Sequence, residues 1–257
     1  MFANERQDII WSMLQKDGAV TTAKLTEHFG VSVETARRDL LTMEKSGKLT
    51  RVHGGAVLKN DMKPYMALPQ RNKEFAQEKY DLSRKAAEFI AEGDIIGVDS
   101  GSTATFFAEV LKERFSSLTC VTYSMDVFQT LCNHKAFSVI LCGGNYLREE
   151  NAFYGELALA ALENLHVQKA FVFPSAVSLE QGIFDYQKDL YQLQKRLIRS
   201  ADKTFMLADS SKFEKTGFLK LGDTQAEHIY VTDSLLPDEI ARLYQENGMT
   251  VYMGGKK

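Results

Sequence analysis

The chain has 257 residues, of which 44% are hydrophobic and 25% are charged, and its formal net charge is −3. This length suits one large domain or two domains, and the composition excludes an intrinsically disordered chain. Because the total charge is slightly acidic, a surface that binds nucleic acid must concentrate its basic residues locally.

The cysteines and the apolar segments set the expected compartment. Cys120, Cys132 and Cys142 have neither metal-ligand spacing nor an even count, so we expect reduced, buried thiols. No apolar run is long enough to span a bilayer, and the first residues lack the apolar core of a signal peptide. We therefore expect a cytoplasmic protein with no membrane partner, no metal ion and no cofactor.

The first 46 residues have the pattern of three helices. Residues 4–16 form the first, a short helix ends at Phe29, and Gly30 supplies a tight turn. Ser32 can then cap a helix that extends to Ser46 and Gly47. This helix places Ala36, Leu40 and Met43 on one face, which we assign to the core.

The other side of this predicted helix is suited to DNA. Glu34, Thr35 and Arg38 share it, Arg37 lies on its flank, and Ser32 lies at its start. An arginine can donate two hydrogen bonds to the edge of a guanine, or one to a phosphate. A pair of arginines can also be ordinary surface charge, but the turn, the cap and the following segment together favour a helix-turn-helix.

A β-like pattern follows over residues 48–58, interrupted by Gly54 and Gly55. It predicts the two-stranded wing of a winged helix, with the two glycines at its tip. Lys48, Arg51 and His53 are then expected at or near the DNA backbone. His53 fits equally well a structural role in which it ties the wing to the recognition helix.

A polar stretch with Pro64 and Pro69 covers residues 59–73 and has the composition of a linker. It separates a predicted DNA-binding domain, residues 1–58, from a second domain, residues 74–257. The second domain begins with a predicted helix over residues 74–91, with Phe75 on its apolar side.

The second domain alternates short β-rich runs with helical periods, one of which covers residues 151–165. This order predicts an α/β fold with a mainly parallel sheet, in which ligands bind at the carboxyl ends of the strands. The predicted strands are 95–99, 119–123, 138–142, 170–173, 204–208, 229–232 and 250–252.

The strongest ligand signal is the turn between the first of these strands and the next helix. Gly101 permits close approach of the backbone, and the start of the helix offers free N–H groups and partial positive charge. An ordinary helix cap has a similar sequence, and the absence of a lysine excludes a Walker A loop. The candidate residues are Asp99, Ser100, Gly101, Ser102, Thr103 and Thr105.

Three later strand ends supply further candidates on the same rim. Tyr123 and Ser124 end the second strand, and Gly143 and Gly144 follow the third. Lys212 follows the fifth strand and brings an ammonium group suited to a phosphate or a sugar hydroxyl, although it can also be a surface lysine.

These segments together resemble a known family. Residues 32–40 (SVETARRDL), 47–56 (GKLTRVHGGA), 99–103 (DSGST), the Gly-Gly turn and 209–213 (DSSKF) are similar to the pattern of the DeoR family of bacterial sugar-metabolism regulators. The departures are Tyr123, where the family often has Asn, and residues 174–177 (PSAV), where it often has a glycine-containing run. Both lie on the predicted ligand rim.

The resemblance implies a transcriptional regulator, expected to be the repressor of a carbohydrate-utilisation operon. It implies operator DNA as one partner, a phosphorylated sugar as effector, a sensor domain similar to ribose-5-phosphate isomerase, and a homodimer or homotetramer. It also implies that Arg71 belongs to the effector pocket.

A sugar-phosphate isomerase with an appended DNA-binding head is the alternative. Proton abstraction beside a carbonyl needs a carboxylate base, for which Glu149, Glu150 or Asp185 could serve. No other residue completes an acid–base pair with them, so we expect no catalytic residues and no enzyme.

Overall fold

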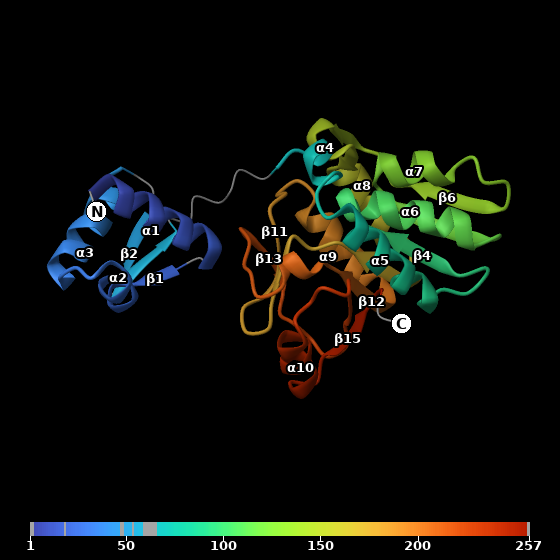
Figure 1. Ribbon diagram of the computed structural model, residues 1–257. Helices are drawn as coiled ribbons and strands as arrows, with labels where there is room; N and C mark the ends of the chain where they lie inside the picture. Colours follow the sequence, from blue (N-terminus) through green and yellow to red (C-terminus); the bar gives the residue numbers. More distant parts are fainter. Residues whose placement is uncertain (1–2, 18, 47–48, 53, 59–65, 256–257) are drawn as a thin grey trace. The chain divides into compact units, whose positions relative to one another are not determined.

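The computed structural model describes residues 3–17, 19–46, 49–52, 54–58 and 66–255 (Figure 1). The chain divides into two compact units, Met1–Tyr65 and Met66–Lys257. None of the described helices is long and apolar enough to cross a membrane.

The first unit contains the three predicted helices: α1 (Ala3–Asp17), α2 (Thr22–Phe29) and α3 (Val33–Lys45). Gly30 ends α2 in the left-handed conformation, with φ of +63°, which favours glycine. The hydroxyl of Ser32 then caps α3 by accepting a hydrogen bond from the Thr35 backbone N–H at 3.2 Å. The predicted helix-turn-helix is therefore confirmed.

Strands β1 (Ala19–Thr21), β2 (Leu49–Val52) and β3 (Gly55–Leu58) form an antiparallel sheet in the order β1-β3-β2. The predicted two-stranded wing thus gains a third strand from the segment between α1 and α2. Gly54 turns the chain between β2 and β3 with φ of +86°. Gly55 lies instead in β3, where a Cβ atom would come within 2.1 Å of the Val20 carbonyl oxygen.

The second unit is built on a seven-stranded parallel sheet in the order β15-β14-β12-β9-β4-β5-β6. All seven predicted strands are present in it. The first strand, β4, pairs with β5 on one side and with β9 on the other, so the strand order reverses at β4. The strands are β4 (Ile95–Val98), β5 (Leu118–Thr122), β6 (Phe137–Leu141), β9 (Val167–Val172), β12 (Ala201–Leu207), β14 (Ile229–Thr232) and β15 (Thr250–Met253).

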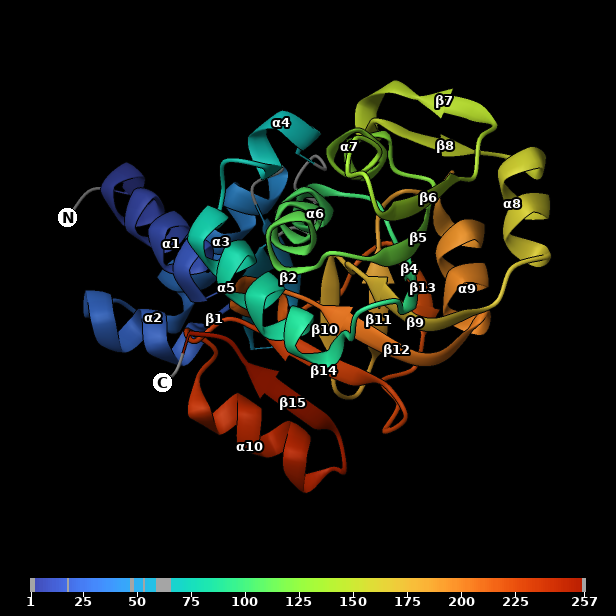
Figure 2. The same ribbon diagram turned by 90° about the vertical axis from the view of Figure 1, so that its right-hand side faces the viewer.

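Helices cover both faces of this sheet (Figure 2). Helices α5 (Ala76–Ala86), α6 (Ser102–Arg114) and α7 (Met125–Leu131) bury one apolar layer with the sheet. Helices α8 (Glu156–Glu163), α9 (Tyr191–Arg199) and α10 (Asp238–Glu246) bury the other. The result is a three-layer α/β unit, as predicted.

Short strands that were not predicted extend the carboxyl edge of the sheet. Strands β7 (Asn145–Leu147) and β8 (Ala152–Tyr154) form a hairpin, so the expected helix over residues 151–165 is wrong in its first turn. The other three form a small antiparallel sheet in the order β10-β11-β13: β10 (Ala176–Ser178), β11 (Gly182–Asp185) and β13 (Leu219–Gly222).

The start of the second unit also differs from the prediction. Of the expected linker 59–73, residues 59–65 lie outside the described residues, whereas 66–73 belong to the second unit and contain α4 (Leu68–Arg71). Leu68 is buried there, so residues 66–73 pack as part of the second unit and do not form a linker. Phe75 precedes α5 with φ of +52° and is 45% exposed, so its assignment to an apolar helix face is wrong. Cys132 is also exposed, in contrast to buried Cys120 and Cys142.

Candidate functional site

The DNA-facing candidates on α3 lie where the helical periodicity places them. Ala36, Leu40 and Met43 are buried, whereas Glu34, Arg37 and Arg38 are exposed on the other side of the helix. Thr35 is half-buried, and its hydroxyl lies 2.9 Å from the capping hydroxyl of Ser32. The two arginines are thus free of the packing that fixes the helix.

Helix α3 is held in place by an ion pair that was not predicted. Asp39 is 4% exposed, and its carboxylate accepts hydrogen bonds from Arg6 of α1, at 2.8 Å from Nε and 3.2 Å from Nη2. A buried aspartate within a run of charged residues gives no periodic signal, because the same letters describe a solvated helix face. The pair fixes the orientation of α3 relative to α1.

The wing contributes one described candidate. Arg51 lies close to Glu44 near the end of α3, with Nε 3.3 Å from Oε2, and the Arg51 backbone N–H donates to Oε1 at 2.9 Å. Its side chain is 41% exposed, so it also remains open to solvent. Lys48 and His53 lie outside the described residues.

In the second unit, the turn after β4 lies where the strand order reverses. Gly101 has φ of +118° and precedes α6, whose first N–H groups receive no side-chain cap. The hydroxyls of Thr103 and Thr105 are buried and have no hydrogen-bond partner among the described residues. Ser100 and Ser102 are each 5% exposed beside them. Open backbone donors at a helix N-terminus favour an anion.

The carboxylate of Asp99 stabilises this turn through hydrogen bonds. It is fully buried, and its carboxylate accepts hydrogen bonds from the Ser100 N–H at 2.7 Å, the Phe173 N–H at 3.1 Å, the Gln194 amide at 3.2 Å and the hydroxyl of Tyr123. Burial raises the pKa of Asp99 to about 6, although the hydrogen bond from Tyr123 lowers it. Asp99 and Tyr123 therefore shape the turn rather than line its open side.

Arg71 approaches the same turn from α4. Its Nη1 lies 3.9 Å from where a Cβ atom would sit on Gly101, and its Nη2 contacts both carboxylate oxygens of Glu150 at 2.6 Å. Glu150 is only 2% exposed and also accepts from the Gln187 amide at 3.0 Å. Burial raises the pKa of Glu150, and Arg71 opposes this rise.

Two lysines add positive charge to this side of the unit. Lys212 lies 3.5 Å from the Asp209 carboxylate, and its side chain is 20% exposed. Lys79 is 3% exposed and donates to the carbonyl oxygens of Arg71 and of Glu74, the latter at 2.6 Å. Burial first, and the Lys212 ammonium second, lower the pKa of Lys79 to about 8. Arg71, Lys79 and Lys212 therefore bring three positive charges close to the carboxylates of this side.

The remaining candidates have mainly structural contacts. Ser124 is 1% exposed, and its hydroxyl caps α7 by accepting from the Val127 N–H at 3.3 Å. A Cβ atom on Gly144 would lie 2.5 Å from the Tyr154 carbonyl oxygen, so Gly144 permits close packing of the hairpin. Gly143 is exposed and open.

Comparison with known proteins identifies both units. Residues 6–61 match the DeoR-like helix-turn-helix domain, and residues 74–234 match the DeoR C terminal sensor domain. The chain belongs to the DeoR family. This DeoR-family protein is therefore a DNA-binding transcriptional regulator, and its second unit is a sensor domain.

Full-length relatives agree with this assignment. The regulator is 31% identical to the L-fucose operon activator of Haemophilus influenzae over 96% of its own chain and 99% of that protein. It is 34% identical to the lactose phosphotransferase system repressor of Lactococcus lactis, over 84% and 85% of the two chains. Ribose 5-phosphate isomerase A of Methanocaldococcus jannaschii is a structural neighbour of low similarity, with a TM-score of 0.40 and 18% identity over 55% and 56% of the chains.

The carboxylates considered for isomerase chemistry are otherwise engaged in this DeoR-family protein. Glu150 is paired with Arg71, and Asp185 is 4% exposed and accepts from the Gln194 amide at 2.7 Å and the Ser175 hydroxyl at 3.0 Å. Glu149 is exposed. The relatives named above are regulators, in agreement with the prediction that this chain is not an enzyme.

Proposed function

We propose that this DeoR-family regulator represses a carbohydrate-utilisation operon and is released from its operator by a phosphorylated sugar. The observation that carries the proposal is the unsatisfied turn at Gly101. It combines open N–H groups of α6, two unpartnered threonine hydroxyls, and the guanidinium of Arg71 close by. A phosphate group matches these donors in charge and in hydrogen-bonding capacity.

The effector site in this proposal is smaller than the set of residues drawn from the sequence. Gly101, Ser102 and Thr103 bind the phosphate through the start of α6, with Thr105 and Ser100 beside them. Arg71 and Lys212 supply positive charge, and exposed Gly143 leaves room for the sugar. Asp99, Tyr123, Ser124 and Gly144 hold the loops in shape.

The DNA surface in this proposal is the exposed side of α3. Arg37 and Arg38 enter the major groove with Glu34 and Thr35 beside them, and Ser32 fixes the start of the helix. Arg51, with Lys48 and His53, contacts the backbone. So small a basic surface binds weakly as a single copy, so we infer a homodimer or homotetramer that joins two or more DNA-binding units.

A route from effector to DNA follows from the position of α4. This helix begins at Leu68, close after the boundary between the two units, and its last residue is Arg71. A phosphate at Gly101 attracts the Arg71 guanidinium away from Glu150 and so changes the position of α4. A ligand acts on DNA binding only to the extent that it binds two arrangements differently.

The test is ligand binding by the full-length protein, because a compound that binds only the folded state raises its melting temperature. A panel of sugar phosphates is compared with the corresponding free sugars, and we expect stabilisation by a phosphorylated member alone. Gly101→Glu should abolish this shift and the release from DNA, while operator binding persists. Gly93→Glu, at the other end of β4 and also at a glycine with positive φ, is the matched control. Equal stabilisation of wild type and Gly101→Glu would exclude the proposed site.

A further inference from the structure

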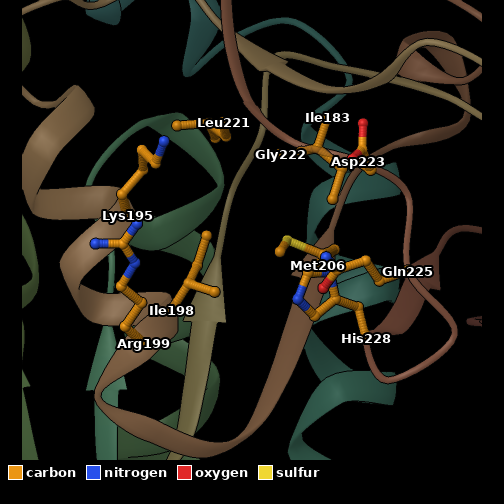
Figure 3. A pocket seen from close by; sticks show the side chains of 10 residues that line it. All are labelled: Ile183, Lys195, Ile198, Arg199, Met206, Leu221, Gly222, Asp223, Gln225 and His228. Atoms are coloured by element: carbon orange, nitrogen blue, oxygen red, sulfur yellow. The ribbon is translucent and has the colours of Figure 1, made fainter.

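A cavity of about 260 Å³ lies in the sensor domain and shares no lining residue with the turn at Gly101. Ten residues line it, and Figure 3 labels all of them. Lys195, Ile198 and Arg199 of α9 form one side. Met206 of β12 and His228, just before β14, form the opposite side (Figure 3).

A buried polar group in this cavity is left without a partner. His228 is 9% exposed, and its Nδ1 has no hydrogen-bond partner among the residues that the structure describes. Burial lowers the pKa of His228, against an opposing effect of Glu227, so the ring is neutral at pH 7. A neutral imidazole offers one donor and one acceptor. A buried polar atom of this kind is normally satisfied by a bound molecule or by water.

The charged groups around the cavity are predominantly positive. Lys195 and Arg199 lie one helical turn apart on α9, on the side that lines the cavity. Lys195 donates to the Tyr191 hydroxyl at 3.2 Å, whereas Arg199 is exposed and has no ion-pair partner within the described part of the chain. The one acidic lining residue, Asp223, is paired with Lys220 at 2.7 Å. An anion is therefore the favoured occupant.

Most of the remaining lining is apolar, although Gln225 also lines the cavity. Ile183, Ile198, Met206 and Leu221 contribute side chains to it. Most hydroxyls of a phosphorylated sugar would face these apolar side chains, because Gln225 adds a single amide group, and inorganic phosphate would leave the apolar surface unfilled. The volume is at the lower end for small-molecule sites, so the occupant is small.

We propose that this cavity is a second ligand site, which binds a small organic anion with an apolar body, such as an aromatic carboxylate or phosphate monoester. The anionic group lies against Arg199 and Lys195, because a guanidinium can pair with either group through two parallel hydrogen bonds. The apolar body packs on Ile198 and Met206. His228 supplies a hydrogen bond beside them.

Calorimetric titration of full-length protein carrying Gly101→Glu, which blocks the phosphate site proposed above, tests this cavity with four probes. Benzoate and phenyl phosphate carry both features, benzyl alcohol lacks the charge, and inorganic phosphate lacks the apolar body. We expect saturable binding of the two aromatic anions and much weaker binding of the other two. Binding that requires only one of the two features, or no saturable binding by any probe, would overturn the proposal.

Variants then locate the binding. Gly222 lines the cavity, and a Cβ atom there would meet no atom within 4 Å, so Gly222→Leu should fill the space without a clash and abolish binding. Arg199→Ala, at an exposed position, should weaken binding about tenfold, the effect of one charge-assisted hydrogen bond. Arg242→Ala, an exposed arginine of α10, and Lys212→Ala, at the Gly101 site, should bind like wild type. Unchanged binding by Gly222→Leu and Arg199→Ala, or its loss in Lys212→Ala, would show that the anion binds elsewhere.

Discussion

Replacing Arg71 by Met should destabilise the sensor domain in a manner that depends on pH. The substitution keeps most of the side-chain volume but leaves Glu150 in a site where it is 2% exposed and where the Gln187 amide donates to it at 3.0 Å. Breaking a buried ion pair from one side typically costs about 3–5 kcal/mol. Glu150 can instead take up a proton and become neutral, so the cost of protonating it is an upper limit to the destabilisation.

The limit follows from the pKa of Glu150 in the unfolded chain. At its ordinary value of 4.5, keeping the carboxyl group neutral at pH 7 costs about 3.4 kcal/mol, or about 1.4 kcal/mol for each pH unit. In the variant the folded state binds a proton that the unfolded state has lost, so stability falls as the pH rises. We expect a loss of about 3 kcal/mol at pH 7, and its pH-dependent part should shrink below about 1 kcal/mol at pH 5.

Urea unfolding at several pH values measures this difference. The only tryptophan, Trp11, lies in α1, so its fluorescence reports the DNA-binding unit, whereas far-UV circular dichroism also follows the sensor domain. The loss should occur in the sensor transition alone. Arg148→Met, at an exposed neighbouring arginine, is the control, and Glu150→Gln added to Arg71→Met should remove the pH dependence. The same loss at pH 5 and pH 8 would refute this explanation.

Three further substitutions test other parts of the molecule. Arg38→Ala should cost about 1–3 kcal/mol of operator binding and relax base preference, whereas Lys48→Ala should weaken binding evenly across sequences. Gel-shift titrations measure both effects. No effect of Arg38→Ala would exclude the side of α3 that is proposed to enter the major groove. Gly55→Ala would place Cβ 2.1 Å from the Val20 carbonyl oxygen, so we expect the free energy of unfolding to fall by about 1–3 kcal/mol. Urea unfolding followed by Trp11 fluorescence measures this loss. An unchanged midpoint would contradict the pairing of β1 with β3. Because burial raises the pKa of Asp99 from 3.8 to about 6, the folded state binds the extra proton, and stability falls as pH rises between these values. Asp99→Asn should remove this decline of about 3 kcal/mol, and parallel pH profiles of the two proteins would show that Asp99 is not the titrating group.

The parts of the fold that follow a strong period could be predicted from the sequence. The seven strands of the parallel sheet are apolar runs, most of them separated by amphipathic helices, and all seven are present. The cap at Ser32 and the turn at Gly30 were predicted because each depends on a local residue preference. The strands that were missed have three or four residues each and, unlike the equally short β4 and β14, they do not alternate with amphipathic helices.

The contacts that stabilise the candidate sites could not be predicted from the sequence, because they join residues that lie far apart in the chain. Arg71 and Glu150 are 79 positions apart, and Arg6 and Asp39 are 33 apart, so no spacing rule connects them. Phe75 was assigned to a helix face because it fits the apolar period. Its left-handed backbone is imposed by the corner between α4 and α5, and nothing in the local sequence indicates it.

The ammonium group of Lys79 stabilises the corner between α4 and α5. Lys79 of α5 donates hydrogen bonds to the carbonyl oxygens of Arg71 and Glu74. These bonds connect the end of α4 to the start of α5. Loss of this ammonium group would free the end of α4 from the start of α5 without changing the arginines of α3. In the proposed route from effector to DNA, the contacts of Lys79 would decide whether a movement of Arg71 also moves the start of α5.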